Sequence, residues 1–367
     1  MSKILAGIRV LELAGIGPSP FCGMLLADLG ADVIVVQAPA ERNAAAVEGD
    51  LIHRGKRGIM LDLKSADGVV AALSIGRHCD AVIEGMRPGV AERLGLGPAE
   101  FSAVNPKIVF GRITGWGQTG PLAMAAGHDI NYVGVSGAGW FSGQPGQPPV
   151  PPPTLVGDVG GGALYLAVGL LAAILRAREC GRGDVIDAAI IDCSAHLTSL
   201  LLSLRATGTL TDDRGGDKGG GWIDGAPWYR CYRCSDGKHV ALGGLEGKFF
   251  DNLMAGLGLS RQFGPESQFD QSRWPEMAQR LTELFASAPR DTWLANMPID
   301  ESCFGPVLTP GEAAEHPHNR ARGVYTSERG FLEATAAPRF ASDHDRGAPQ
   351  RFRRDVELKT LMRELQG

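Results

Sequence analysis

Short apolar runs alternate with segments of helical spacing in the first third of the chain. Runs that end at glycine, proline or a turn sequence, as buried strands do, occupy residues 7–15, 31–39, 81–90 and 107–117. Residues 20–30 have helical spacing, and 58–79 reads as a strand followed by a helix. Since strands that alternate with helices form parallel sheets, the pattern predicts an α/β domain with helices on the faces of its sheet.

The pattern changes after Gly139. Residues 140–153 are rich in proline and predict an extended loop. Two helices are expected next, at 159–179 and about 187–206, and both are apolar around most of their circumference. Such helices need to be covered by other helices or by another subunit. The uncharged stretch 159–175 is near the lower limit for a membrane span, but its glycines and alanines favour a helix buried in protein, so no membrane contact is expected.

The last part of the chain predicts a second, smaller domain. Residues 207–226 lose hydrophobicity and gain glycine and aspartate, as a linker does. Residues 228–245 then predict a hairpin around the turn sequence SDG, and helical runs follow at about 248–257 and 274–288. We therefore expect a large domain at 1–206 and a small α+β domain at 227–324. The tail from about 325 to 367 is polar, is expected to be irregular, and is assigned to the large domain.

Composition narrows the possible partners. The net charge is −5, so no general attraction to nucleic acid or anionic membranes is expected. The seven cysteines are scattered and odd in number, which favours a reducing compartment, and the chain does not open like a secretory signal, so a cytoplasmic protein is expected. Cys231 and Cys234 form a CxxC pair, but residues three apart on a strand face opposite sides, so no metal site is expected.

Loops after the predicted strands carry candidate chemistry. The sequence GIGPSP at 15–20 departs from the dinucleotide fingerprint, since Pro20 replaces its third glycine and Gln37 stands where an acid would bind a ribose. Nicotinamide and flavin cofactors are therefore not expected. The cations of RGKR at 54–57, together with Arg87 and Arg93, are expected at one edge of the sheet, where they would suit a phosphate-bearing ligand.

Several motifs follow one another in a recognisable order. They are LAGIGPSP, HRGKR with LDLKS, EGMRPGVAERLGLGP, TGWGQTGP, GHDINY, a GD before a glycine-rich helix start at 156–162, RGDVIDAAIID and a late PVL at 306–308. In this order and over almost the whole chain, the sequence resembles the α-methylacyl-CoA racemases, which belong to the superfamily of family III CoA-transferases.

The resemblance implies an architecture and a ligand. The large domain would hold a Rossmann-like parallel sheet, and two chains would thread each other in an interlocked homodimer. The active site would lie between the large domain of one subunit and the small domain of its partner. The substrate would be a 2-methyl-branched acyl-CoA, and no separate cofactor is implied because CoA is part of the substrate.

The resemblance also assigns site residues. It places two catalytic bases at His128 and Asp158, and a supporting glutamate at Glu246. The residues that it places against CoA are Arg54, Arg57, Leu61, Asp62, Leu63, Lys64, Gly85, Met86, Arg87, Arg93, Gly127, Asp129, Ile130, Asn131 and Tyr132. One departure concerns the end of the second strand, where similar racemases often carry charged residues. This chain offers Val35, Gln37 and Ala38 there, which bears on CoA affinity rather than on chemistry.

The implied reaction needs two bases that flank one carbon. Inverting the α-carbon of a thioester removes a proton on one face and returns one on the other. An imidazole has an ordinary pKa near 6.5, which suits this task, whereas an aspartate would need its pKa raised by desolvation. The enolate oxygen also needs donors, and the backbone N–H groups of Asp158 and Gly160 at a helix start are the candidates. Asp129 is expected to make local backbone bonds.

Two other functions remain open from the sequence. In a family III CoA-transferase, the aspartate at 158 would attack the thioester as a nucleophile. Such enzymes generally lack the histidine of GHD and carry a glycine-rich loop where this chain has Glu246, so racemisation is favoured. A non-catalytic CoA-binding homologue would need to lose one base, and both are present. The acyl group could be a branched fatty acid, a sterol side chain or an aryl-propionyl group.

Overall fold

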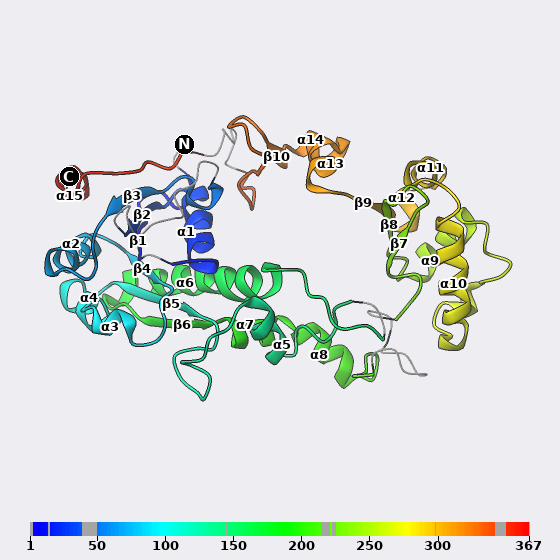
Figure 1. Ribbon diagram of the computed structural model, residues 1–367, viewed down its shortest axis with the longest axis horizontal. Helices are drawn as coiled ribbons and strands as arrows, with labels where there is room; N and C mark the ends of the chain where they lie inside the picture. The colour runs from blue at the N-terminus through cyan, green and yellow to red at the C-terminus, as the bar shows by residue number, and fades with distance from the viewer. Residues whose placement is uncertain are drawn as a thin grey trace. The chain divides into compact units, whose positions relative to one another are not determined.

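The chain folds into two compact units (Figure 1). A computed structural model describes residues 3–13, 15–38, 50–143, 146–213, 221, 225–297, 299–341 and 350–366. The first unit is made from three separate segments, Met1–Gly139, Pro151–Thr198 and Arg322–Gly367. The second unit contains Trp140–Val150 and Ser199–Ala321. The expected linker at 207–226 falls within the second unit, and its residues 214–220 and 222–224 lie outside the described part of the chain.

A six-stranded sheet forms the centre of the first unit. Its strands are β1 (Arg9–Glu12), β2 (Asp32–Gln37), β3 (Arg57–Met60), β4 (Ala81–Glu84), β5 (Val109–Thr114) and β6 (Val185–Ala189). They lie in the order β3-β2-β1-β4-β5-β6, and every neighbouring pair is parallel. The expected α/β fold with a parallel sheet is therefore confirmed. The order reverses between β1 and β4, which is where open parallel sheets bind ligands.

Helices cover both faces of this sheet (Figure 1). On one face, α1 (Pro18–Asp28) and α6 (Tyr165–Cys180) pack against residues such as Val10, Val33 and Ile113. On the other face, α2 (Ala66–Gly76), α4 (Pro98–Val104) and α15 (Leu358–Gln366) pack against alternate residues such as Leu11 and Ile34. Because side chains alternate along a strand, the continuous apolar runs supply both layers of the core.

The sequence led us to expect that a helix begins within RGDVIDAAIID, but this segment contains a strand instead. Residues Val185–Ala189 form β6, which pairs with β5 over five positions. The expected helix at 187–206 is replaced by α7 (Ile190–Leu197) and α8 (Ser199–Ala206). The physical reason is long-range: the open edge of β5 offers backbone hydrogen bonds that local sequence cannot reveal.

The helix after the proline-rich loop begins four residues earlier than expected. A π-helix, η3, spans Leu155–Leu164 and continues directly into α6. Leu166 and Leu170 of α6 pack over Gly111 of β5, where a side chain would collide with them. The combined helix is long and apolar enough to cross a membrane, but this face of it covers the sheet, whereas Val168 and Leu175 are exposed.

The tail is more regular than expected. It forms β10 (Tyr325–Thr326), which pairs antiparallel with β11 (Glu333–Ala334), and ends in α15. Leu361 and Leu365, four residues apart, are buried in the layer beside α2. These two leucines are too few to mark a helix by periodicity when the sequence around them is charged, and packing against the sheet decides the structure.

The second unit has a three-stranded antiparallel sheet of its own. Its strands β7 (Cys231–Arg233), β8 (His239–Leu242) and β9 (Phe304–Val307) lie in that order, so the expected hairpin is confirmed and gains a third strand. Its helices are α8 (Ser199–Ala206), α9 (Gly247–Gly256), α10 (Trp274–Phe285), α11 (Arg290–Asn296), α12 (Ile299–Ser302), α13 (Pro310–Glu315) and α14 (Pro317–Arg322). Trp228 is fully buried, meets Phe250 of α9 and Trp274 of α10 edge to face, and donates its indole N–H to the carbonyl of Gln268 at 2.7 Å.

A buried ion pair joins β1 to the segment before β3. Lys56 Nζ lies 2.7 Å from Glu12 Oε2 and also donates to the carbonyl of Pro20 at 2.8 Å. Both side chains are almost inaccessible to water, at 0% and 1% exposed. Burial raises the pKa of Glu12, and the Lys56 ammonium opposes that rise. The pair therefore fixes the start of α1 against two strands at the cost of desolvating two charges.

Removing only the cation of this pair should destabilise the protein. Lys56→Met leaves the carboxyl of Glu12 buried without its partner, and we expect the free energy of unfolding to fall by about 3–5 kcal/mol. Urea denaturation followed by circular dichroism measures it. The double variant Lys56→Met with Glu12→Leu is the control, and it should recover most of the loss. A double variant no more stable than Lys56→Met alone would contradict this account.

Candidate active site

A cavity of about 640 Å³ opens at the carboxyl ends of β1, β4 and β5. Its wall is built from the loop after β1, the loop after β4, the loop after β5, the segment at 123–132 and the first turn of η3. The cavity lies at the reversal of strand order, as expected for a ligand site in an open parallel sheet. It brings together nine of the residues assigned from sequence: Gly85, Met86, Arg87, Gly127, His128, Asp129, Asn131, Tyr132 and Asp158.

His128 stands at the start of α5 (Asp129–Val135) and lines the cavity. Its backbone N–H donates to Asn131 Oδ1 at 3.1 Å, so the side chain of Asn131 holds the first turn of the helix. The side chain of His128 is exposed, unlike its neighbour Asp129. The GHDIN sequence thus forms a helix start that leaves an accessible imidazole at the cavity wall.

Asp158 is half-buried in the first turn of η3 and lines the same cavity. Its pKa is raised to about 6, chiefly by burial and also by the nearby carboxylate of Asp129, whereas His128 opposes this rise. A carboxyl group with a pKa near 6 populates both protonation states near neutral pH. Asp158 can therefore act as an acid or as a base, which an ordinary aspartate does poorly.

Asp129 ties α5 to the start of η3. One of its carboxylate oxygens accepts the backbone N–H of Asp158 at 2.8 Å, and the other accepts that of Thr154 at 3.1 Å. Asp129 was expected to bond backbone groups close in sequence, and this expectation is corrected, since the donors are 25 and 29 residues away. Gly157 is required here because a Cβ at that position would lie 2.3 Å from the carboxylate.

The expected backbone donors for an enolate oxygen are already engaged. The Asp158 N–H donates to Asp129, and Gly160 is not in the first turn of its helix. Since a π-helix bonds each N–H to the carbonyl five residues earlier, the N–H of Gly160 faces the carbonyl of Leu155. From the sequence, we expected the helix to begin near the glycine run at 160–162. In the structure, Thr154 is the N-cap, and the helix begins at Leu155.

Aromatic residues shape the side of the cavity near His128. Tyr132 donates its hydroxyl to the carbonyl of Gly127 and meets Trp116 edge to face, with ring centroids 4.8 Å apart. Burial raises the pKa of Tyr132, the charge of Asp158 adds to this rise, and Arg87 opposes it. The phenol of Tyr132 therefore lies within the electrostatic influence of both the Asp158 carboxylate and the Arg87 guanidinium on the loop after β4.

The buried carboxylate of Glu84 holds the loop after β4. Glu84 accepts the backbone N–H of Met86, and Arg112 donates its Nε–H to the other oxygen of Glu84 at 3.1 Å. Arg112 also reaches Glu92 at 2.5 Å. Burial raises the pKa of Glu84, while Arg112 counteracts this effect. The ion pair of Glu84 with Arg112 therefore fixes the start of this loop, and the loop carries Gly85 and Arg87 to the cavity wall.

The cations of RGKR do not share an edge with Arg87, so the expected single cluster does not form. Arg57 begins β3 and pairs with Asp32, the first residue of β2, and with Glu364. Arg54 is buried and pairs with Asp28 at 2.5 Å. The physical reason is that carboxylates distant in sequence pair with each cation of this segment: Asp28 with Arg54, Glu12 with Lys56 and Asp32 with Arg57.

Other assigned residues lie outside this cavity. They are Leu61, Asp62, Leu63 and Lys64 after the carboxyl end of β3, Arg93 at the end of α3 (Val90–Arg93), Ile130, which is 63% exposed, and Gly160. Glu246 belongs to the second unit, where it precedes α9.

Several lining residues were not assigned from sequence. Ser19, Trp116, Ile113 and Ile190 line the cavity. Ser19 lies in the first turn of the helix that follows β1, and Trp116 lies in the loop that follows β5, so their position after strands was the available signal. The isoleucines read only as core residues in sequence.

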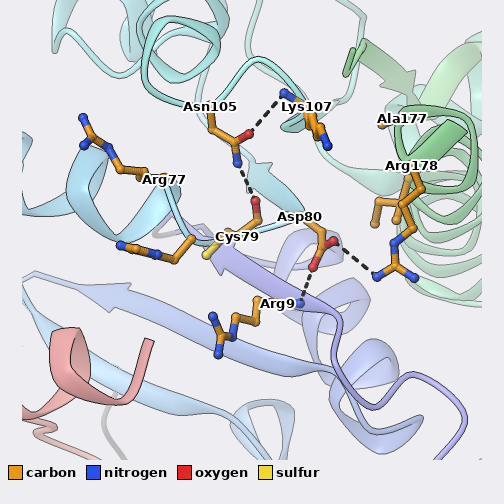
Figure 2. Close-up of a pocket in the computed structure, with 10 residues that line it drawn as sticks. Arg9, Arg77, Cys79, Asp80, Asn105, Lys107, Ala177 and Arg178 are labelled. Carbon is orange, nitrogen blue, oxygen red and sulfur yellow. Dashed lines mark hydrogen bonds and ion pairs between the residues drawn. The ribbon is translucent and has the colours of Figure 1, made fainter. Parts of the chain in front are cut away.

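A second cavity, of about 430 Å³, lies at the opposite edge of the sheet (Figure 2). Arg9, Arg77, Lys107 and Arg178 line it, with Asp80 accepting the backbone N–H of Arg9 at 2.8 Å. Helices α2, α4 and α6 all end beside it, and helix carboxyl ends carry partial negative charge. We attribute the basic lining to compensation of these helix ends.

Comparisons with known proteins agree with this architecture. The protein family described as "CoA-transferase family III" matches residues 5–351 of the chain. The sequence is 38% identical to "Alpha-methylacyl-CoA racemase" of Mus musculus, covering 89% of this chain and 83% of that one. It is 37% identical to the protein of the same name from Homo sapiens, covering 91% and 86%.

A transferase and a solved structure are also similar. "Succinyl-CoA--D-citramalate CoA-transferase" of Chloroflexus aurantiacus is 28% identical, over 90% of this chain and 85% of that one. The crystal structure of a CAIB/BAIF family protein from Brucella suis has a TM-score of 0.81 and 26% identity, and the match covers 100% of this chain and 99% of that one. From the family match and the racemase relatives, the chain belongs to CoA-transferase family III.

Proposed function

We propose that the chain is an isomerase that interconverts (2R)- and (2S)-2-methylacyl-CoA thioesters by 1,1-proton transfer. The observation that carries this proposal is the single cavity that holds His128 together with Asp158, whose pKa is raised to about 6. The racemases of mouse and human support the substrate class. Because CoA is part of the substrate, no separate cofactor is proposed.

In the proposed mechanism, each base works on one face of the α-carbon. One base takes the α-proton, the electron pair of the C–H bond moves into the bond to the carbonyl carbon, and the carbonyl oxygen gains negative charge. The other base then donates its proton to the opposite face, and the electron pair returns to the α-carbon. His128 and Asp158 exchange these roles between the two directions, so the pair must hold one proton in total.

The surroundings of the two bases support this division of labour. Asp129 fixes the backbone of Asp158 and keeps a negative charge nearby, which favours the protonated form of Asp158. The exposed guanidinium of Arg87 lies at the cavity wall and is suited to a CoA phosphate. Glu246 is proposed as the carboxylate that orients His128 in the assembled enzyme.

CoA transfer is the second candidate, and it has a specific observation in its favour. The carboxyl group of Asp158 is accessible in the cavity, and a nucleophilic carboxylate is what covalent CoA transfer requires. Transferases are also among the relatives, at lower identity than the racemases. Racemisation is favoured because a histidine lines the same cavity, a group that covalent transfer by Asp158 does not need.

We also propose that the chain forms a homodimer. The exposed side of α6 carries Val168 and Leu175, and α8 in the second unit exposes Leu200 and Leu202. Large exposed apolar side chains along helices are typical of interaction surfaces. A second copy of the chain would remove them from water.

Deuterium exchange tests the two-base mechanism directly. One enantiomer of a 2-methylacyl-CoA is incubated in deuterium oxide without an acceptor acid, and α-deuterium and stereochemistry are followed together. We expect deuterium uptake with progress towards both epimers. His128→Ala and Asp158→Ala should each lower epimerisation by about 10²–10⁴-fold, since each removes one proton carrier.

A histidine outside the site provides the matched control for this experiment. His78 lines the second cavity, so His78→Ala should epimerise at the wild-type rate. If the wild type gives neither exchange nor epimerisation, but transfers CoA once a free carboxylic acid is added, the isomerase assignment is wrong and Asp158 acts as a nucleophile.

The pH dependence of kcat/KM should report the shared proton. We expect a bell-shaped profile, identical in both directions, because only the singly protonated pair is active and the equilibrium constant is independent of pH. Asp129→Asn removes a negative charge that raises the pKa of Asp158. The pKa of Asp158 therefore falls below about 6, and the acid limb should move to lower pH.

Asp67→Asn is the control for the pH measurement, since Asp67 lies in the first turn of α2 and does not line the cavity. Its profile should coincide with that of the wild type. An acid limb that stays in place or moves to higher pH in Asp129→Asn would contradict the role given to this charge.

The dimer is tested by placing a charge on α6. We expect Val168→Glu to weaken association at least about tenfold, because a buried unpaired charge costs more than 1.4 kcal/mol. Sedimentation velocity over a concentration series measures the mass. Val70→Glu on α2, where the valine is similarly exposed, should leave the mass unchanged. Equal masses for wild type and Val168→Glu at every concentration would exclude this face.

A further inference from the structure

The proposed reaction leaves a negative charge that needs donors. When the α-proton is removed, the thioester oxygen becomes the oxyanion of an enolate, and such oxygens are stabilised by preorganised N–H or O–H groups. The amide of Asp158 already donates to Asp129, and Gly160 lies inside η3. The donors must therefore come from another part of the cavity wall.

The start of α1 offers them. Its first residues are Pro18, Ser19 and Pro20, and the prolines have no N–H. Phe21 donates its N–H to the carbonyl of Gly17. Ser19 thus supplies the remaining backbone donor of the first turn, at the positive end of an eleven-residue helix, and it bonds no described backbone group there.

The hydroxyl of Ser19 is a second and independent observation. Ser19 lines the cavity, its side chain is 0% exposed, and its Oγ has no hydrogen-bond partner among the described residues. A Cβ on Gly15 would lie 2.3 Å from this oxygen, and one on Gly85 would lie 2.6 Å from it. The two glycines follow β1 and β4, so the hydroxyl occupies the crevice between these neighbouring strands.

This hydroxyl belongs to the same region as Asp158. A Cβ on Gly17 would lie 3.7 Å from Asp158 Oδ2, and one on Gly162 would lie 3.3 Å from the Cβ of Pro18. The first turn of α1 therefore packs directly against the helix that carries Asp158. A buried hydroxyl without a partner is uncommon in proteins, and at a ligand cavity it indicates a group that a ligand satisfies.

We propose that Ser19 is a substrate-binding catalytic residue whose hydroxyl and backbone N–H hold the thioester oxygen and stabilise the enolate. The hydroxyl donates a hydrogen bond and keeps its proton, so the proton balance between His128 and Asp158 is unchanged. The positive end of α1 adds to the stabilisation as charge develops on the oxygen. This inference rests on the proposed isomerase function.

Ser19→Ala tests the proposal. We expect kcat for epimerisation and for α-deuterium uptake to fall about 100-fold with KM little changed, because the bond strengthens as charge develops. Ser194→Ala is the matched control. Ser194 is also fully buried, also lacks a partner for its Oγ among the described residues, and contacts η3 at Gly161, but it does not line the cavity. This variant should keep the wild-type kcat.

A truncated substrate separates the thioester oxygen from the rest of CoA. The ethanethiol ester of the same acid has the thioester oxygen but no pantetheine amide, and we expect the same fold-loss in Ser19→Ala for both substrates. A loss confined to the CoA ester would mean that Ser19 binds a pantetheine amide, and it would overturn the proposal. An unchanged kcat in Ser19→Ala together with a large loss in Trp116→Phe would also overturn it, because Trp116 Nε1 is the other buried donor without a partner among the described residues that line the cavity.

The wild type separates this inference from the function on which it rests. If the wild type neither exchanges nor epimerises the substrate, the proposed function fails first. If it does both, and Ser19→Ala matches it while folding normally by circular dichroism, only the role of Ser19 is wrong.

Discussion

The carboxylate of Asp129 is the interaction on which the candidate site depends. By accepting backbone N–H groups from Thr154 and Asp158, it compensates the start of η3 from outside that helix. The same charge helps to raise the pKa of Asp158, and the same residue begins the helix next to His128. One buried side chain thus sets the position of one base, the protonation of that base and the approach of the other.

Much of the fold could be predicted because its signals are local. The strands β1, β2, β4 and β5 are continuous apolar runs, and only a sheet covered on both faces tolerates such runs. The motifs GHDINY and GD were equally direct, and the structure brings His128 and Asp158 to one cavity. The hairpin of the second unit followed from its turn residues.

The remaining features depend on partners that are distant in sequence. β6 exists because β5 has an open edge, and α15 exists because the sheet has a face to cover. Arg54 and Arg57 read as cations for a phosphate, but Asp28 and Asp32 neutralise them. From the sequence, the backbone N–H of Asp158 was expected to be free for a ligand, but it donates to Asp129, which belongs to another helix. In each case the deciding interaction joins segments that no short sequence window contains.

The first unit is assembled from three stretches of chain, and this has a consequence for biosynthesis. The second unit is complete once residue 321 has left the ribosome, because its other segment, 140–150, is translated earlier. The layer that contains α2 still lacks Leu361 and Leu365 at that moment. Nascent chains therefore expose part of the hydrophobic core of the first unit until residue 365 has left the ribosome. A chaperone that shields apolar surface would act on the first unit rather than on the second.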